Sequence, residues 1–393
     1  MMHLAAAVLL ALAQTNDKAQ ANGYDDAWKA AWRTQCRTVL LGGTGKTDGF
    51  VLHIGDSITY SSAYGAWIGG GAGRTNLEDL PLCNWINNFA VPGGIDATSM
   101  NGLYLAHKDI PGGNRAMTAA GGIATDEFLS GNNNGGPQMP ATMNVGTAQG
   151  YVSSSTYTGN LQIQTVAYAF SGAQIAVLML GTNDCSAGRT AAAFIADLQT
   201  IVTTLEGNHI AVVLSTIPPH SSNNALAIQY NTQITNYARS HGLPLIDFYA
   251  EILARQPVNY ASTLMNPGDV HPSGDRAGYT VSSDPYANGG DPATHKTGAA
   301  AAEVGYLLRS WLTVQKLKEV QSFVVTGNPA VPANPAPAPP GPAPAPTPSS
   351  GSGGGGGGGH CGGSISGPVS PEMLLISALA ALALLGAARK TGF

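Results

Sequence analysis

The chain has 393 residues, of which 44% are hydrophobic and only 10% are charged, so it can bury one sizeable core or two small ones. Its formal net charge is −5 and it shows no basic patch, which excludes electrostatic binding of nucleic acid. No Cys-x-x-Cys or His-x-x-x-His pattern suggests a structural zinc site.

The first 21 residues resemble a secretory signal peptide. Their apolar run, residues 4–13, is too short to span a bilayer, and the small-x-small site Ala19-Gln20-Ala21 follows it. We therefore expect cleavage before Asn22 and export of the mature protein; the alternative is an ordinary apolar N-terminal helix. Export permits one disulfide among Cys36, Cys83 and Cys185, and the sequence does not say which pair.

Residues 22–326 form the expected folded domain, in which strand-like and helix-like segments alternate. Short apolar runs ending at turn residues predict buried strands at 50–54, 85–91, 174–180, 209–216 and 243–248. Helical spacing and end signals predict helices at 190–206, 224–241 and 299–318. This order predicts an α/β fold with a mainly parallel sheet and helices on both faces.

Two segments interrupt the alternation. Residues 100–160 are rich in Gly, Asn, Ser and Thr, and we interpret them as a long insertion over the site with small strands near 151–166. Residues 275–295 are interpreted as a second insertion.

The C-terminal end differs in composition from the domain. Residues 327–360 form a Pro- and Gly-rich linker, expected to be disordered, and residues 361–393 contain Cys361, an apolar stretch at 373–388 and then Arg389-Lys390. Together these features resemble bacterial C-terminal sorting tails, which makes Cys361 a candidate for a sorting or processing enzyme. The alternative is a plain hydrophobic membrane anchor. In both cases the tail would hold the protein at a bacterial cell surface.

Three short motifs follow predicted strand ends, where parallel sheets bind their ligands. Ser57 in Gly-Asp-Ser is a candidate nucleophile, and a serine nucleophile needs a base to take its proton. The alternative is that Ser57 only caps the following helix. Gly93 in Val-Pro-Gly-Gly would let a backbone N–H approach a ligand. Asn183 in Gly-Thr-Asn-Asp can donate its amide to a developing oxyanion. Simple turns are the alternative for Gly93 and Asn183.

The candidate base is His271, in Gly-Asp-Val-His-Pro-Ser. His295 competes for the same role, whereas we interpret His53, His220 and His241 as surface or packing residues. Asp56 and Asp184 are expected to stabilise turns. The segment Gly42-Gly43-Thr44-Gly45-Lys46-Thr47 faintly resembles a phosphate-binding loop, but a strand follows where a helix is required, so a polar turn is expected.

Taken in order, the four motifs resemble those of the GDSL/SGNH hydrolase family over roughly residues 51–320. The resemblance implies a flavodoxin-like three-layer α/β/α fold and ester hydrolysis without metal or cofactor. It implies that Ser57 attacks the ester and His271 takes its proton. The oxyanion would be bound by the N–H groups of Ser57 and Gly93 and by the amide of Asn183.

The acidic residue departs from the family pattern. The family usually has aspartate three residues before the histidine, where this chain has Gly268, and Asp269 lies two before. We expect Asp269 to orient His271; a backbone carbonyl is the alternative.

These features predict an exported serine hydrolase that cleaves short-chain acyl esters or carbohydrate O-acetyl esters through an acyl-serine intermediate. Its substrate would be a small molecule or a polysaccharide. We expect no nucleic-acid partner, and we expect the protein to contact a membrane only through its tail. The alternatives are an acyltransferase that uses the same serine and a noncatalytic surface adhesion module.

Overall fold

The computed structural model describes residues 25–70, 76, 79–87, 102–107, 116–131, 161–289, 292–294 and 299–327, all within one compact unit. The expected signal peptide, linker (apart from its first residue, Gly327) and C-terminal tail, with Gly93, His295 and Cys361, lie outside the described residues.

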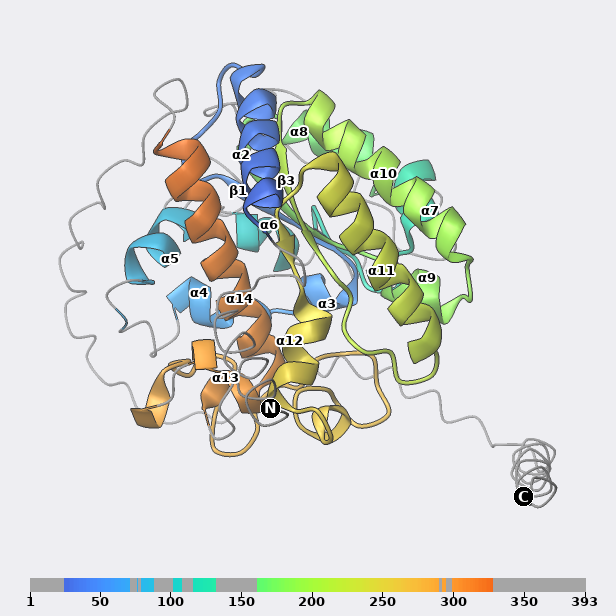
Figure 1. Cartoon of the computed structure of the whole chain (residues 1–393), viewed down its shortest axis with the longest axis vertical. Helices are drawn as coiled ribbons and strands as arrows, with labels where there is room; N and C mark the ends of the chain where they lie inside the picture. The colour runs from blue at the N-terminus through green and yellow to red at the C-terminus, as the bar shows by residue number, and fades with distance from the viewer. Residues whose placement is uncertain are drawn as a thin grey trace, which may run out of the picture. The chain divides into compact units, whose positions relative to one another are not determined.

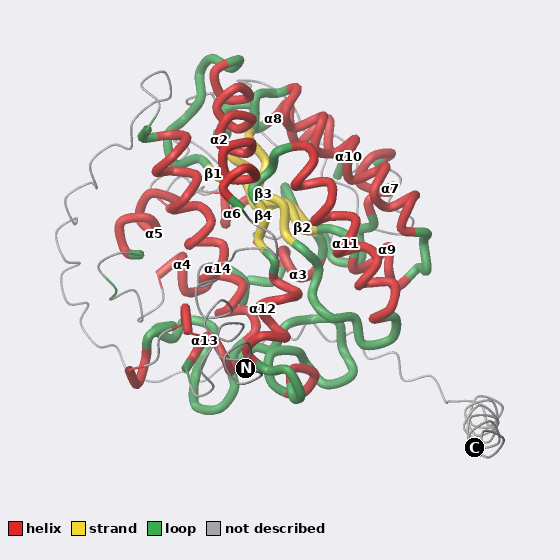
Figure 2. The backbone as a smooth tube through the Cα atoms, viewed as in Figure 1, coloured by secondary structure: helices red, strands yellow, loops and turns green. Residues whose placement is uncertain are grey.

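Four parallel strands form the central sheet in the order β1 (Val51–Gly55), β2 (Ile175–Met179), β3 (Ala211–Ser215) and β4 (Leu245–Ile246). Every residue of these strands is buried, because helices lie on both sides of the sheet (Figure 1, Figure 2). The α/β class and the parallel sheet are therefore as predicted. The register sets His53 opposite Val177.

The strand expected at 85–91 is wrong as far as the structure describes it. Trp85 lies in α5 (Leu80–Asn87), where the buried Leu82, Trp85 and Ile86 share one helical face. Residues 118–120 occupy the edge of β1 instead. Gly55 forms a parallel bridge with Ala119, and Ala120 N donates to Gly55 O at 3.2 Å.

The segment 100–160 is not simply an insertion over the site. Its described parts include α6 (Gly102–His107) and α7 (Thr125–Ser130), whose Leu103, Leu105 and Phe128 are buried in the core. Small strands were expected near 151–166. Residues 151–160 lie outside the described residues, and the end of this range is helical, because it belongs to α8 (Ile163–Ala169), which buries Ile163, Val166 and Ala167. These helices are short and mix polar with apolar residues, so the spacing of their apolar residues did not predict them.

The two helices expected at 190–206 and 224–241 begin and end close to where their sequence signals predict. The side chain of Thr190 accepts a hydrogen bond from Ala193 N at 3.2 Å and begins α10 (Ala191–Gly207). Gly242, at φ 75°, ends α11 (Asn224–His241). The expected strand at 243–248 is shorter, because Asp247 caps α12 (Phe248–Arg255). The remaining elements include α2 (Asp26–Leu41), α3 (Ser57–Tyr60), α4 (Ala66–Gly70), α9 (Thr182–Ser186), η1 (Tyr260–Ser262), η2 (Ala287–Gly289) and η3 (Pro292–Thr294).

The helix expected at 299–318 is interrupted at Val304, which separates α13 (Ala300–Glu303) from α14 (Gly305–Val320). The short η4 (Gln321–Val325) follows α14. Buried Arg309 of α14 donates to Ile58 O and to Thr59 Oγ1, both at 2.8 Å. The C-terminal helix thus contacts the turn that follows β1.

Cys36, Cys83 and Cys185 are separate, buried thiols, so no disulfide joins them in the described structure. None of the described helices has the length and apolar content needed to cross a membrane.

Candidate active site

Ser57 is the first residue of α3, directly beyond β1. The carboxylate of Asp56 caps this helix by accepting from Ile58 N at 3.0 Å, so Asp56 stabilises the turn as predicted. Burial raises the pKa of Asp56, against the Ile58 hydrogen bond and the nearby charge of Arg309. Ser57 remains partly exposed while Ile58 and Thr59 are buried. A side chain at Gly55 would overlap Met179 O, so the turn requires glycine there.

His271 lies on a short loop that α14 holds in place. Asn266 N donates to His271 O at 3.0 Å, and Met265 pairs with Pro272. At the base of the loop, Ser273 Oγ accepts from Gly305 N at 2.9 Å. These bonds fix the backbone on both sides of the imidazole.

The structure brings Ser57, His271 and Asp269 into one chain of hydrogen bonds. His271 Nε2 lies 2.8 Å from Ser57 Oγ, and His271 Nδ1 lies 2.8 Å from Asp269 Oδ1. An ionised carboxylate only accepts, so Nδ1 carries the hydrogen and Nε2 can accept the proton of Ser57. The side chains of His271 and Asp269 are 31% and 44% exposed, which leaves the site open to solvent.

Gly268 explains how an aspartate two residues before the histidine reaches its ring. Its φ of 72° reverses the chain just before Asp269, and Val270 N donates to Asp269 Oδ1 at 2.6 Å. Burial raises the pKa of Asp269, but the hydrogen bond and the charge of His271 outweigh it and lower that pKa below its usual 3.8. Asp269 is therefore a carboxylate at neutral pH.

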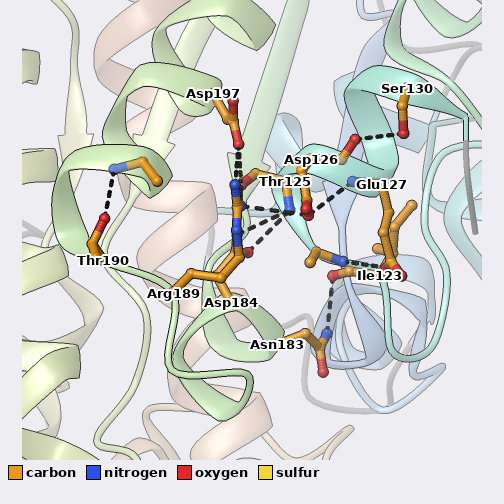
Figure 3. Close-up of polar contacts among 12 residues, drawn as sticks. Ile123, Thr125, Asp126, Glu127, Ser130, Asn183, Asp184, Arg189, Thr190 and Asp197 are labelled. Carbon is orange, nitrogen blue, oxygen red and sulfur yellow. Dashed lines mark hydrogen bonds and ion pairs between the residues drawn. The ribbon is translucent and has the colours of Figure 1, made fainter.

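Asn183 lies in α9, beyond the end of β2. Its Nδ2 donates to Ile123 O at 3.0 Å (Figure 3). A side-chain amide has two hydrogens, and within the described part of the chain this bond uses one of them, which leaves the other for a ligand. The next residue, Asp184, is buried and bonds to Thr125, so it joins α9 to α7 rather than only stabilising a turn.

Residues 121–123 adjoin the candidate site, and sequence reasoning did not single them out. The segment follows the bridge at Ala119, and its ends are held by Gly55 O through Ala120 and by Asn183 through Ile123. It contains Gly121-Gly122, with Gly122 at φ 80°. The sequence signal that could have identified this segment is a glycine pair after a run of small and apolar residues. A similar glycine pair pointed to Gly93.

A second serine–histidine pair lies nearby but has the wrong proton arrangement for a base. His220 Nε2 is 2.9 Å from Ser186 Oγ, and His220 Nδ1 accepts from Asn223 N at 3.1 Å. Because Nδ1 accepts, the neutral ring carries its hydrogen on Nε2 and donates to Ser186. His220 is buried and packs α9 against the loop after β3.

The other histidines also have structural partners. Buried His53 bonds through Nδ1 to Tyr64 Oη at 2.8 Å, and His241 Nε2 lies 2.8 Å from Glu206 Oε2. Neither contacts Ser57 among the described hydrogen bonds.

The glycine-rich segment at 42–46 borders a cavity of about 290 Å³ near the amino ends of the strands. Lys46 Nζ donates there to the carbonyl oxygens of Ser171, Ala173 and Asn208, at 2.7, 3.0 and 2.9 Å. These bonds use all three ammonium hydrogens, so the lysine joins loops rather than presenting a charge to phosphate.

Residues 53–280 match the GDSL-like Lipase/Acylhydrolase family. Among solved structures, the chain is similar to a member of the lipolytic protein G-D-S-L family from Veillonella parvula, at 16% identity and TM-score 0.33 over 67% of this chain and 96% of that one. It is also similar to a GDSL-like lipase from Bacteroides thetaiotaomicron, at 14% identity and TM-score 0.31 over 62% and 90% of the two chains. A carbohydrate esterase family 3 protein from Talaromyces cellulolyticus shows 17% identity and TM-score 0.32 over 57% and 87%.

No curated protein matches the sequence. The family match covers more than half of the chain and contains Ser57, Asn183 and His271. The chain therefore belongs to the GDSL-like lipase/acylhydrolase family.

Proposed function

We propose that this protein is an exported serine hydrolase that cleaves carboxylic esters through an acyl-serine intermediate. The observation that carries the proposal is the hydrogen-bonded series Ser57–His271–Asp269, with 2.8 Å at each step between the side chains. A hydroxyl is a weak nucleophile, and a neutral imidazole oriented by a carboxylate activates it.

In the acylation step, His271 Nε2 takes the Ser57 proton while Oγ forms a bond to the ester carbonyl carbon. The carbonyl electron pair moves onto oxygen. When the tetrahedral intermediate collapses, the bond to the alcohol oxygen breaks, and His271 returns the proton to that leaving group. Water then attacks the acyl-serine by the same route, releasing the acid and free Ser57. Asp269 stabilises the imidazolium formed at each stage.

The oxyanion needs N–H donors close to Ser57. Ser57 N is at the first position of α3, where helix N–H groups have no intrahelical partner, and Asn183 has a second amide hydrogen. Gly93 was predicted as the third donor from the family resemblance and lies outside the described residues. The backbone of residues 121–123, held between Gly55 and Asn183, supports a donor from that segment instead.

For the substrate, we propose short-chain acyl esters or carbohydrate O-acetyl esters. The partial exposure of Ser57, His271 and Asp269 suits an acyl group carried on a large or soluble alcohol. We propose export and surface attachment from the sequences of the two ends of the chain. Proteolytic processing of the N- and C-termini in the mature protein would support this proposal.

The test is hydrolysis of a panel of nitrophenyl esters and acetylated sugars by the whole protein, with fluorophosphonate labelling in parallel. We expect turnover of short acyl esters and labelling that disappears in Ser57→Ala. Labelling that persists in Ser57→Ala, or a wild type that neither hydrolyses nor labels, would contradict the proposal. Transfer of the acyl group to an added sugar in preference to water would favour the acyltransferase alternative.

A further inference from the structure

A buried polar cluster joins α9 to the start of α7 beside the candidate site (Figure 3). The side chain of Asp184 is 0% exposed and accepts from Thr125 N at 3.0 Å and from Thr125 Oγ1 at 2.6 Å. Arg189 forms an ion pair with Asp184 and donates to Thr125 Oγ1 at 2.7 Å. The Thr125 hydroxyl therefore both donates to the carboxylate and accepts from the guanidinium.

This cluster is next to the bond that holds Asn183. Asn183 and Asp184 are consecutive, and their partners Ile123 and Thr125 are two residues apart. Two adjacent connections thus fix α9 against the segment that follows residue 120. Because Ala120 N also donates to Gly55 O, the segment is held at both ends, beside Ser57 and beside Asn183.

The guanidinium of Arg189 offsets the negative charge of the buried Asp184 carboxylate. Burial raises the pKa of Asp184, while the hydrogen bonds from Thr125 and Arg189 act in the opposite direction. Arg189 also bonds to Asp197 Oδ2 at 2.6 Å, on the more exposed side of the cluster. A buried carboxylate that loses one of these donors must take up a proton or move, because unpaired charge is costly away from water.

We propose that Thr125, Asp184 and Arg189 are positioning residues that set the spacing between the Asn183 amide and the backbone at 121–123. This inference rests on the proposed function. Among the hydrogen bonds of the described residues, these side chains bond to one another and to neither Ser57 nor His271, so they act on the oxyanion through the loops that they join. A misplacement of about 1 Å in such donors can cost roughly 100-fold in rate.

The sharpest test compares Thr125→Val with Thr125→Ser. Valine keeps the shape and the backbone N–H of Thr125 but removes the hydroxyl, whereas serine keeps the hydroxyl. Thr190→Val is the matched control, because its hydroxyl caps α10 through Ala193 N and is exposed. That substitution removes a capping hydrogen bond at the start of α10 and keeps the hydroxyl of Thr125 in the cluster.

The readouts are kcat, KM, the melting temperature and the rate at which a fluorophosphonate labels Ser57. For Thr125→Val we expect kcat and the labelling rate to fall about 10- to 100-fold while KM changes by less than about threefold. Thr125→Ser should stay within about threefold of wild type. Thr190→Val should lower the melting temperature and leave kcat unchanged.

The outcomes separate this inference from the proposed function. If wild type labels at Ser57 and Thr125→Val labels at the same rate, the positioning role is wrong and the hydrolase remains. A fall in kcat for Thr190→Val as large as that for Thr125→Val would show a stability effect and also overturn the role. If wild type does not label at Ser57, the proposed function fails and the inference fails with it.

Discussion

At the scale of single residues, Asp269 shows how a local backbone conformation replaces an expected spacing. Gly268 adopts φ 72°, and this lets a carboxylate two residues before His271 reach Nδ1 at 2.8 Å. We predict that Asp269→Ala lowers kcat by roughly 10²- to 10⁴-fold, because the ring loses the partner that selects its tautomer. Steady-state kinetics on a nitrophenyl ester will measure it. Turnover near that of wild type would assign the orienting role to another group.

Asn183 gives a second prediction at this scale. Its side chain is partly exposed and, among the residues that the structure describes, makes one hydrogen bond, to Ile123 O, so Asn183→Ala should remain folded. We expect kcat to fall by roughly 10²- to 10³-fold, the usual effect of losing an oxyanion donor. Circular dichroism will check folding and initial rates will check kcat. Ser57→Ala provides the inactive reference, and an Asn183→Ala enzyme with full activity would exclude the amide from the oxyanion site.

At the scale of elements, the start of α14 determines where the His271 loop lies. Gly305 N donates to Ser273 Oγ, and a side chain at Gly305 would overlap Leu264 O. Gly305→Ala should therefore displace the loop and lower both the melting temperature and kcat. Gly274→Ala is the control, since a Cβ at Gly274 meets no atom within 4 Å. Equal effects of the two substitutions would show that this close approach does not matter.

His220 links α9 to the loop after β3, and this link depends on pH. Burial lowers the pKa of His220 below its usual 6.5, against a hydrogen bond to the Thr182 backbone. Because the folded pKa is lower, the unfolded chain binds more protons below pH 6.5. Stability therefore falls as pH drops from about 6.5 to the folded pKa, by at most about 1.4 kcal/mol per pH unit for one such group.

We predict that His220→Gln removes this part of the pH dependence. Chemical denaturation of both proteins between about pH 5 and 7.5 will measure the free energy of unfolding across the usual histidine pKa. Other buried histidines such as His53 titrate in both proteins, so the difference between the two curves isolates His220. A difference that does not change with pH would contradict the prediction.

At the scale of the whole molecule, the folded unit is larger than the segment that matches the family. The match covers residues 53–280, yet Trp28 and Trp32 of α2 and Trp311 of α14 are buried in the core. Arg309 of α14 also binds the turn after Ser57. Both α2 and α14 therefore contribute to the core, and α14 also contacts the site.

We predict that a protein of residues 25–327 unfolds cooperatively and keeps its esterase activity, whereas residues 53–280 alone do not fold. Removing α2 and α14 would expose apolar surface on the sheet and leave the His271 loop without Gly305. Thermal unfolding followed by circular dichroism will compare the two. A cooperative transition in residues 53–280 would show that the terminal helices are dispensable.

Local signals in the sequence were enough to predict the α/β class, the strands that become β1 to β4, and the ends of α10 and α11. They also identified Ser57, Asn183, Asp269 and His271 as candidate site residues. Those features depend on local signals: short apolar runs, cap residues and motifs at strand ends. The structure added that α5 replaces a predicted strand and that residues 118–120 take the edge of β1.

The distances between the segments of the site come from tertiary contacts. Ser57 and His271 are 214 residues apart in sequence, and only the parallel sheet and α14 bring their side chains within 2.8 Å. The same holds for residues 121–123 and for the cluster of Thr125, Asp184 and Arg189. Short polar segments carry no periodicity, so their positions follow from long-range hydrogen bonds and burial that no local pattern encodes.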